Sequence, residues 1–170
     1  MPYYNRKNPR LHDYNYSENG AYFITICTQE KKHLFSRIVD STANLPECEL
    51  TDYGRIVQSV LSLLPKRFPI TVERYVIMPN HIHLLVMIQD MDRVRAIRES
   101  PLQGRSMISN VVGYLKMNAS KEIHRMGGPS QIWQRSFHDH IIRDRKDFEK
   151  IWMYIEDNPR RWKEDCFYIP

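Results

Sequence analysis

The strongest constraint on the fold is a pair of consecutive apolar segments rich in β-branched residues. They are ITVERYVIM at 70–78 and HIHLLVMI at 81–88. Their length and composition are typical of β-strands, and the intervening Pro79-Asn80 pair is typical of a turn. Two such segments so close together predict an antiparallel hairpin.

Further strands and three amphipathic helices are predicted around this hairpin. An upstream strand begins at Ala21 in AYFITICT, and residues 131–144 form a further extended segment. The order strand, helix, two hairpin strands, helix, strand, helix contains no alternating parallel series, which indicates an α+β protein with an antiparallel sheet and helices packed mainly on one face. The expected helix limits are Thr51 to Pro65 or Pro69, Ser106 to Gly127, and 146–157 before Pro159.

The length and composition favour one folded domain over residues 1–170. At 42% hydrophobic and 26% charged residues, the chain is not disordered as a whole. Residues 1–20 show no helical or strand period and are expected to form an extended basic arm or a solvated tail, and the charged segment 89–105 is expected to be a mobile loop. No stretch approaches the roughly 20 apolar residues of a membrane span and no signal peptide is evident, so we expect a cytoplasmic protein without a membrane partner.

Charge and cysteine usage narrow the function classes. A net charge of +5 suits a phosphate-bearing partner without requiring one. The three cysteines, Cys27, Cys48 and Cys166, are far apart and form no CxxC pair. Both a disulfide framework and a thiolate zinc site are therefore not expected.

Histidines with strand spacing are the first candidate site. Side chains two apart in a strand point the same way, so His81 and His83 present two imidazoles on one face. Two neutral imidazoles are a partial ligand set for a divalent ion, which needs at least one further donor, usually oxygen. A pair of surface or hydrogen-bonded histidines explains the same pattern. His138 and His140 form a second such pair.

A tyrosine on the last predicted helix is the second candidate. Tyr154 and Asn158 are one turn apart and share a helix face. Tyr154 lies roughly 110° from the centre of the apolar stripe, at its flank. An ordinary half-buried tyrosine fits this position too. Tyr114 and Asn118 have the same spacing, which alone does not separate the two tyrosines.

These motifs together resemble a known family. MPNHIHLLV, WQRSFHDHIIRDRKDFEKIWMYIEDNPRRW and AYFITICT resemble the REP-associated tyrosine transposases, which are single-tyrosine HUH transposases, from about Tyr14 to Trp162. The resemblance implies a ferredoxin-like antiparallel sheet that cleaves and rejoins single-stranded DNA beside a palindromic hairpin. It matches His81 and His83 to the HUH histidines, Tyr154 to the nucleophile, and Asn158 to the polar metal-site position where related enzymes often have Gln.

A phenol with a pKa of about 10 is a weak nucleophile at neutral pH, so its attack on phosphorus needs help from positioning, a base or a cation, and a cation is expected to supply most of it. Magnesium or manganese held by His81, His83 and Asn158 would orient the scissile phosphate for attack by Tyr154, giving a 5′-phosphotyrosine. His140 is expected to play a supporting role. The residues expected to contact single-stranded or hairpin DNA are Arg6, Lys7, Arg10, Arg143, Arg145, Arg160, Arg161 and Lys163.

Two other functions stay open. One is a hairpin-binding module on the same fold that never cleaves, and the other is a zinc phosphoesterase whose site includes His138 and His140. Family resemblance also leaves open both a single copy and a homodimer as the working form. The protein is expected at the nucleoid when bound to DNA.

Overall fold

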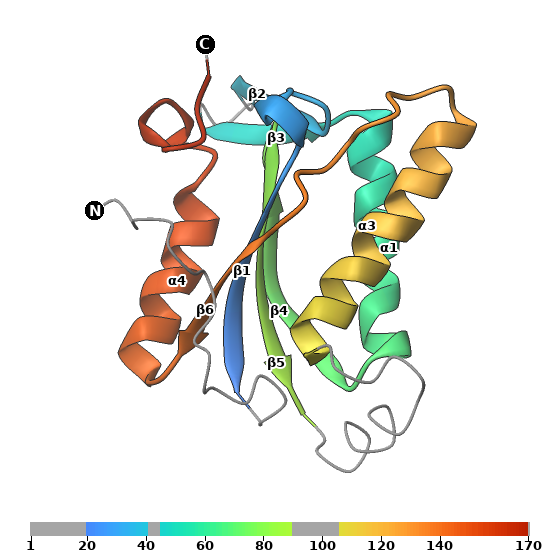
Figure 1. Ribbon diagram of the computed structural model, residues 1–170. Helices are drawn as coiled ribbons and strands as arrows, with labels where there is room; N and C mark the ends of the chain where they lie inside the picture. The colour runs from blue at the N-terminus through green and yellow to red at the C-terminus, as the bar shows by residue number, and fades with distance from the viewer. Residues whose placement is uncertain (1–19, 41–44, 90–105, 170) are drawn as a thin grey trace.

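A four-stranded antiparallel sheet forms the centre of the molecule (Figure 1). The computed structural model describes residues 20–40, 45–89 and 106–169. The strands are β1 (Ala21–Cys27), β4 (Ile70–Ile77), β5 (His81–Ile88) and β6 (His138–Ile142), in the spatial order β4-β5-β1-β6. The predicted hairpin is β4–β5, and β5 lies inside the sheet between β4 and β1. Because β5 pairs with a strand on each side, its register is fixed, and with it the face of the sheet to which each of its side chains points.

Helices cover both faces of this sheet. In Figure 1, α1 (Asp52–Arg67) and α3 (Met107–Arg125) lie on one side and α4 (Arg145–Asp157) lies on the other. The four strands of this sheet, together with α1 and α3, follow the β-α-β-β-α-β order of ferredoxin-like folds, and α4 follows β6. The predicted α+β class is confirmed, and α1 and α3 share one face of the sheet.

The alternation of β5 separates a large core from the candidate site. Ile82, Leu84 and Val86 join the main core beneath α1 and α3. Leu85 packs instead with Ile151 and other side chains of a second, smaller core beneath α4. His81 and His83, which alternate with the main-core residues, therefore face the α4 side.

Three sequence expectations need correction. A hairpin of β2 (Ser36–Asp40) and β3 (Pro46–Leu50) was not predicted, because each strand has only five residues and charged residues interrupt the apolar ones. Pro65 lies inside α1 rather than ending it, since a proline in the last turn removes only one helical hydrogen bond. Within 131–144, only β6 and a single bridge at Trp133 pair with the sheet, and the Lys116 ammonium binds the carbonyls of Gln134 and Ser136 in place of a strand partner.

Some other expectations are confirmed, and some concern residues outside the described part of the chain. Thr51 and Ser106 cap α1 and α3 by accepting hydrogen bonds from Gly54 and Ser109. No disulfide joins Cys27, Cys48 and Cys166, which all lie within the described residues. Across the described segments, no helix is long and apolar enough to cross a membrane. The expected arm with Arg6, Lys7 and Arg10, and the expected loop at 89–105, lie outside the described residues apart from Gly20 and Gln89.

Packing at the start of α1 gives a stability prediction. A Cβ added to Gly54 would collide with the backbone carbonyl oxygen of Phe35. A backbone atom cannot move aside as the end of a flexible side chain can. We expect Gly54→Ala to lower the free energy of unfolding by about 2 kcal/mol or more. Gly113→Ala is the matched control, because no described atom outside its own helix backbone lies within 4 Å of its added Cβ, and it should stabilise α3 by about 0.5–1 kcal/mol. Urea unfolding of both variants measures the difference; equal stabilities would contradict the packing argument.

Candidate active site

Two buried histidines form the centre of the site. His81 and His83 are 0% and 1% exposed, and their Nε2 atoms lie 3.0 Å apart. Strand β5 holds both residues, with Cys27 and Thr25 of β1 opposite them. The two imidazoles therefore share one face of a rigid interior strand, as the alternation predicts.

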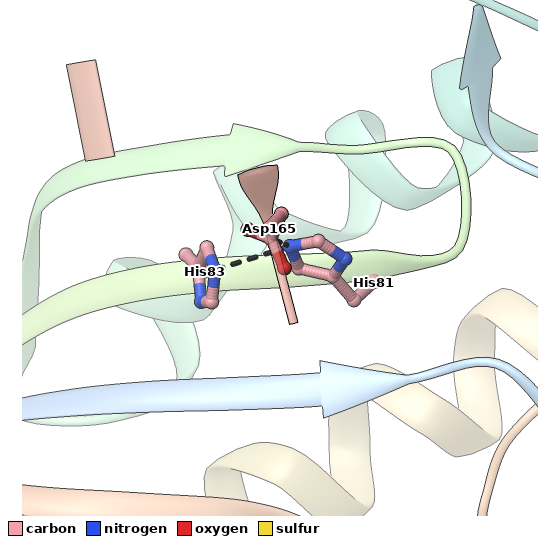
Figure 2. A group of neighbouring side chains, drawn as sticks. All are labelled: His81, His83 and Asp165. Atoms are coloured by element: carbon pink, nitrogen blue, oxygen red, sulfur yellow. Dashed lines mark hydrogen bonds and ion pairs between the residues drawn. The ribbon is translucent and has the colours of Figure 1, made fainter. Parts of the chain in front are cut away.

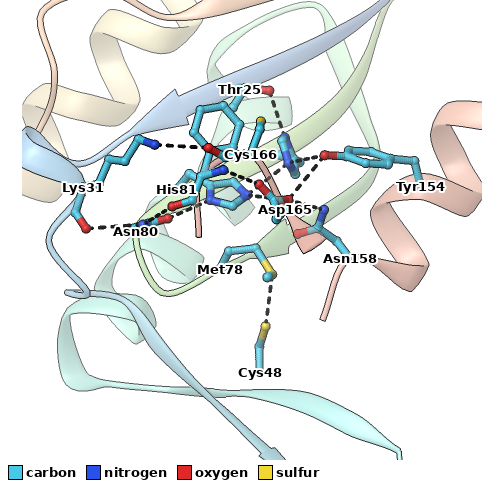
Figure 3. Close-up of polar contacts among 12 residues, drawn as sticks. Thr25, Lys31, Cys48, Met78, Asn80, His81, Tyr154, Asn158, Asp165 and Cys166 are labelled. Atoms are coloured by element: carbon cyan, nitrogen blue, oxygen red, sulfur yellow. Dashed lines mark hydrogen bonds and ion pairs between the residues drawn. The ribbon is translucent and has the colours of Figure 1, made fainter. Parts of the chain in front are cut away.

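Hydrogen bonds around His81 define its tautomer. The Asn80 amide nitrogen donates to the backbone carbonyls of Lys31 and Phe167, so its Oδ1 faces the His81 Nδ1 at 2.9 Å (Figure 3). An amide oxygen only accepts, so Nδ1 carries the proton and Nε2 keeps a lone pair. Asn80 thus orients His81 as metal-binding histidines are oriented, through a hydrogen bond on the nitrogen opposite the ligating one.

His83 has a more adaptable partner. Its Nδ1 lies 2.8 Å from the Thr25 hydroxyl. A hydroxyl both donates and accepts, so Thr25 serves either tautomer of His83. The ring is also held by Phe23, whose centroid is 5.0 Å away.

Both histidines are neutral in this setting. Burial lowers the pKa of His81 to about 3, and the Lys31 ammonium acts in the same direction. Burial, together with the adjacent His81, also lowers the pKa of His83 well below its usual value. A neutral imidazole is the form that binds a metal ion.

Helix α4 brings Tyr154 to the histidines. Its hydroxyl lies 3.5 Å from the His83 Nε2, and its ring packs edge-on against Phe23. Burial raises the pKa of Tyr154 above its usual value, and the neighbouring Asp165 carboxylate adds to the effect. The phenol is therefore protonated at neutral pH.

The second tyrosine candidate lies elsewhere. Tyr114 is on α3, packs edge-on against Phe68 and belongs to the main core on the opposite face of the sheet. The Asn118 amide donates to the Tyr114 backbone carbonyl. Of the two Tyr-Asn pairs, only Tyr154 and Asn158 lie at the histidines.

Asp165 is the site residue that the sequence analysis missed. It follows the short 3-10 helix η2 (Trp162–Glu164), and its Oδ2 is 4.0 Å from the His81 Nε2 (Figure 2). The Tyr154 hydroxyl donates to the same oxygen at 3.4 Å. One ligand atom from each of His81, His83 and Asp165 lies within 4.8 Å of the other two. Asp165 lies beyond α4, far along the chain from β5. No periodicity or spacing rule relates the two, so the position of Asp165 beside the histidines is seen only in the folded structure.

Asn158 supplies a further oxygen. It caps the C-terminal end of α4, is 2% exposed, and donates through Nδ2 to Asp165 Oδ2 at 3.0 Å. Its Oδ1 is buried and has no hydrogen-bond partner among the described residues. A buried acceptor without a donor is costly, so this oxygen is available as a ligand for a cation. Two imidazoles with carboxylate and amide oxygens fit a divalent cation.

The other residues named from the sequence were expected in supporting or DNA-binding roles. His140 pairs with Asp147 at 2.7 Å. Within the described part of the chain, His138 and His140 join no cluster of three potential ligands, so a four-histidine site is not formed. Arg145, Arg160 and Arg161 are exposed and pair with Glu149, Asp157 and Glu164, whereas Arg143 and Lys163 are exposed without such pairs among the described side chains.

The C-terminal segment covers the histidines. The rings of Phe167 and Trp162 pack at 4.7 and 5.9 Å from the His81 ring. The Lys31 ammonium donates to the Cys166 carbonyl at 3.1 Å and lies over the Phe167 ring. These contacts make residues 162–168 the layer between the histidines and solvent.

Comparisons with known proteins find sequence relatives and related solved structures. The chain matches no model of a protein family. It is 32% identical to an uncharacterized protein of Haemophilus influenzae, over 98% of this chain and 94% of that protein. It is 29% identical to a candidate REP-associated tyrosine transposase of the same species, over 85% of this chain and 73% of that protein. A solved REP-associated tyrosine transposase bound to a REP hairpin has a TM-score of 0.59 and 19% identity, over 95% of this chain and 74% of that chain, and shares the fold.

Proposed function

We propose that the chain is a REP-associated tyrosine transposase, that is, a metal-dependent endonuclease and strand transferase acting on single-stranded DNA beside a palindromic hairpin; its 29% identity to a candidate transposase of that family supports this. The observation that carries this proposal is the Tyr154 hydroxyl, 3.5 Å from one of two paired, buried imidazoles. A potential nucleophile beside a set of metal ligands is the arrangement that tyrosine attack on phosphorus requires.

Each residue of the site has a proposed role in such a reaction. His81, His83 and Asp165 would hold a magnesium or manganese ion, with the free Oδ1 of Asn158 beside them. When bound, such an ion stabilises charge on the phosphate oxygens. Tyr154 Oη would bond to phosphorus as the bond from phosphorus to the 3′ oxygen breaks, and the phenol proton, which Asp165 Oδ2 at 3.4 Å can accept, would pass to the departing 3′ oxygen. The products are a 5′-phosphotyrosine and a 3′-hydroxyl, and attack by another 3′-hydroxyl reverses the step without ATP.

Access to the site requires a local movement. Phe167 and Asp165 occupy the space over the imidazoles and beside the tyrosine hydroxyl. We therefore propose that DNA entry displaces the Phe167 side chain, whereas Asp165 stays beside the histidines and Tyr154.

One copy of the chain contains the whole proposed site, because Tyr154, both histidines and Asp165 come from the same chain. A homodimer is therefore not needed to complete the site. The proposed partner is hairpin DNA of the repetitive extragenic palindrome type, which places the protein in the cytoplasm at the nucleoid.

The test uses labelled oligonucleotides that carry a stable stem-loop and randomised single-stranded flanks. Incubation with magnesium or manganese should give a protein–DNA adduct that survives denaturation, and EDTA should prevent it. Hairpin binding without an adduct in either metal would favour a binding module. Turnover of a phosphate ester with zinc and no adduct would favour a phosphoesterase.

The third ligand is tested by metal affinity alone. We expect Asp165→Asn to weaken manganese binding about tenfold or more, because it removes the carboxylate charge closest to His81. Glu164→Gln is the matched control, since Glu164 is exposed and pairs with Arg161. Manganese titration followed by electron paramagnetic resonance measures both variants. Equal affinities in Asp165→Asn and wild type would remove Asp165 from the ligand set.

A further inference from the structure

A groove lies beside the candidate active site, between the β2–β3 hairpin and the C-terminal segment. Its volume is about 820 Å³. Arg37, Ile38 and Pro46 line the hairpin wall, and residues 159–164 with Tyr168 line the other. The proposed reaction uses none of these side chains.

Cationic side chains dominate this groove. Arg37, Arg160, Arg161 and Lys163 outnumber the two lining carboxylates, Asp40 and Glu164. Arg160 and Arg161 pair with neighbouring carboxylates, whereas Arg37 and Lys163 form no ion pair with another described side chain. Both are exposed. They are therefore available to bind phosphate groups.

A row of aromatic rings connects the groove to the histidines. The Trp162 ring lies 5.7 Å from His33, 5.3 Å from Tyr168 and 5.9 Å from His81, measured between centroids. Trp162 is buried, whereas His33 is exposed and Tyr168 is half-buried. Two accessible rings thus flank a buried one that touches the candidate metal site.

Cations that bind phosphates and rings that can stack on bases are together characteristic of single-stranded nucleic-acid sites. Bases of a duplex are stacked on each other and do not offer their faces to a protein ring. We propose, building on the function above, that this groove holds the single-stranded DNA next to the scissile phosphate, with Arg37 and Lys163 on its phosphates and His33 and Tyr168 against its bases. The hairpin stem lies outside the groove, and the groove selects the flanking nucleotides.

Binding of labelled stem-loops by the full chain in EDTA, followed by fluorescence anisotropy, tests the phosphate contacts. One probe carries a single-stranded flank on the 5′ side, one on the 3′ side, and one has no flank. We expect Arg37→Ala combined with Lys163→Ala to weaken binding of at least one flanked probe about tenfold and to lower its salt slope by about 2. The unflanked probe should bind as it does to wild type.

Lys66→Ala combined with Lys121→Ala is the matched control, because it removes the same charge from exposed positions on α1 and α3. Equal weakening by the control pair, or equal weakening for flanked and unflanked probes, would overturn the proposal.

Stacking is tested with 2-aminopurine at successive flank positions. Its fluorescence should fall on binding to wild type, His33→Ala should remove part of that quenching, and His33→Phe should restore it. Quenching unchanged in both His33→Ala and Tyr168→Leu would overturn the stacking contacts. Because these experiments contain no metal, they are separate from adduct formation. Flank binding without any adduct would reject the proposed cleavage and keep the groove.

Discussion

Tyr154→Phe is expected to abolish the covalent protein–DNA adduct, whereas Tyr114→Phe should leave it at the wild-type level. The change removes one oxygen, the atom 3.5 Å from the His83 Nε2 and 3.4 Å from the Asp165 Oδ2. Without that oxygen no bond to phosphorus can form at this position. Tyr114 packs against Phe68 on the opposite face of the sheet, so its hydroxyl has no path to the same phosphate.

The measurement is denaturing gel electrophoresis of protein incubated with labelled flanked stem-loops and manganese. Tyr154→Phe should keep its fold, since its ring still packs against Phe23 and only two long hydrogen bonds are lost. Thermal unfolding and hairpin binding check this directly. An adduct of normal yield in Tyr154→Phe would show that another residue is the nucleophile.

Local periodicity explains which parts of the site the sequence reveals. Alternation along 81–88 places both histidines on one face of a strand, and one-turn spacing places Tyr154 and Asn158 on one face of the last helix. What brings the two faces together is the packing of α4 on β4 and β5, which buries Ile151 and Ile155 beneath the sheet. The apolar stripe of α4 predicts that burial, but not which face of the sheet receives it.

Contacts without a local pattern could not be predicted. Asp165 reaches the histidines because the chain turns back after Asn158 and places Trp162 and Phe167 on His81. That turn depends on tertiary contacts such as the Asn80 bond to the Phe167 carbonyl. Arg37 was missed for a similar reason, since its position in the groove depends on the unpredicted β2–β3 hairpin.

The predicted DNA-binding residues differ in their surroundings. Arg145, Arg160 and Arg161 each pair with an acidic residue three or four positions away. A phosphate would have to compete with these local carboxylates, although exposed pairs are weak. Lys163 has no such competitor among the described side chains and lies in the groove. Among the cations named from sequence, it therefore has the strongest structural support as a phosphate contact.

His81→Gln and His83→Gln are each expected to remove both metal binding and adduct formation. Each imidazole is one of three donors within 4.8 Å, and Gln cannot reproduce the nitrogen ligand in its place. Because a ligand that binds only the folded state stabilises it, manganese should raise the melting temperature of the wild type. At a metal concentration of 100 times Kd the gain is about 2.7 kcal/mol, and neither variant should show it.

The same melting experiment separates the remaining hypotheses. His140→Gln is the control, because His140 pairs with Asp147 and lies outside the metal-ligand group, so it should keep the manganese shift and the adduct. Melting without metal shows whether loss of the buried His81 or His83 ring destabilises the fold by itself. A full manganese shift and a normal adduct in either His81→Gln or His83→Gln would remove that histidine from the metal site. Loss of the shift in His140→Gln together with zinc-dependent hydrolysis would instead favour the phosphoesterase.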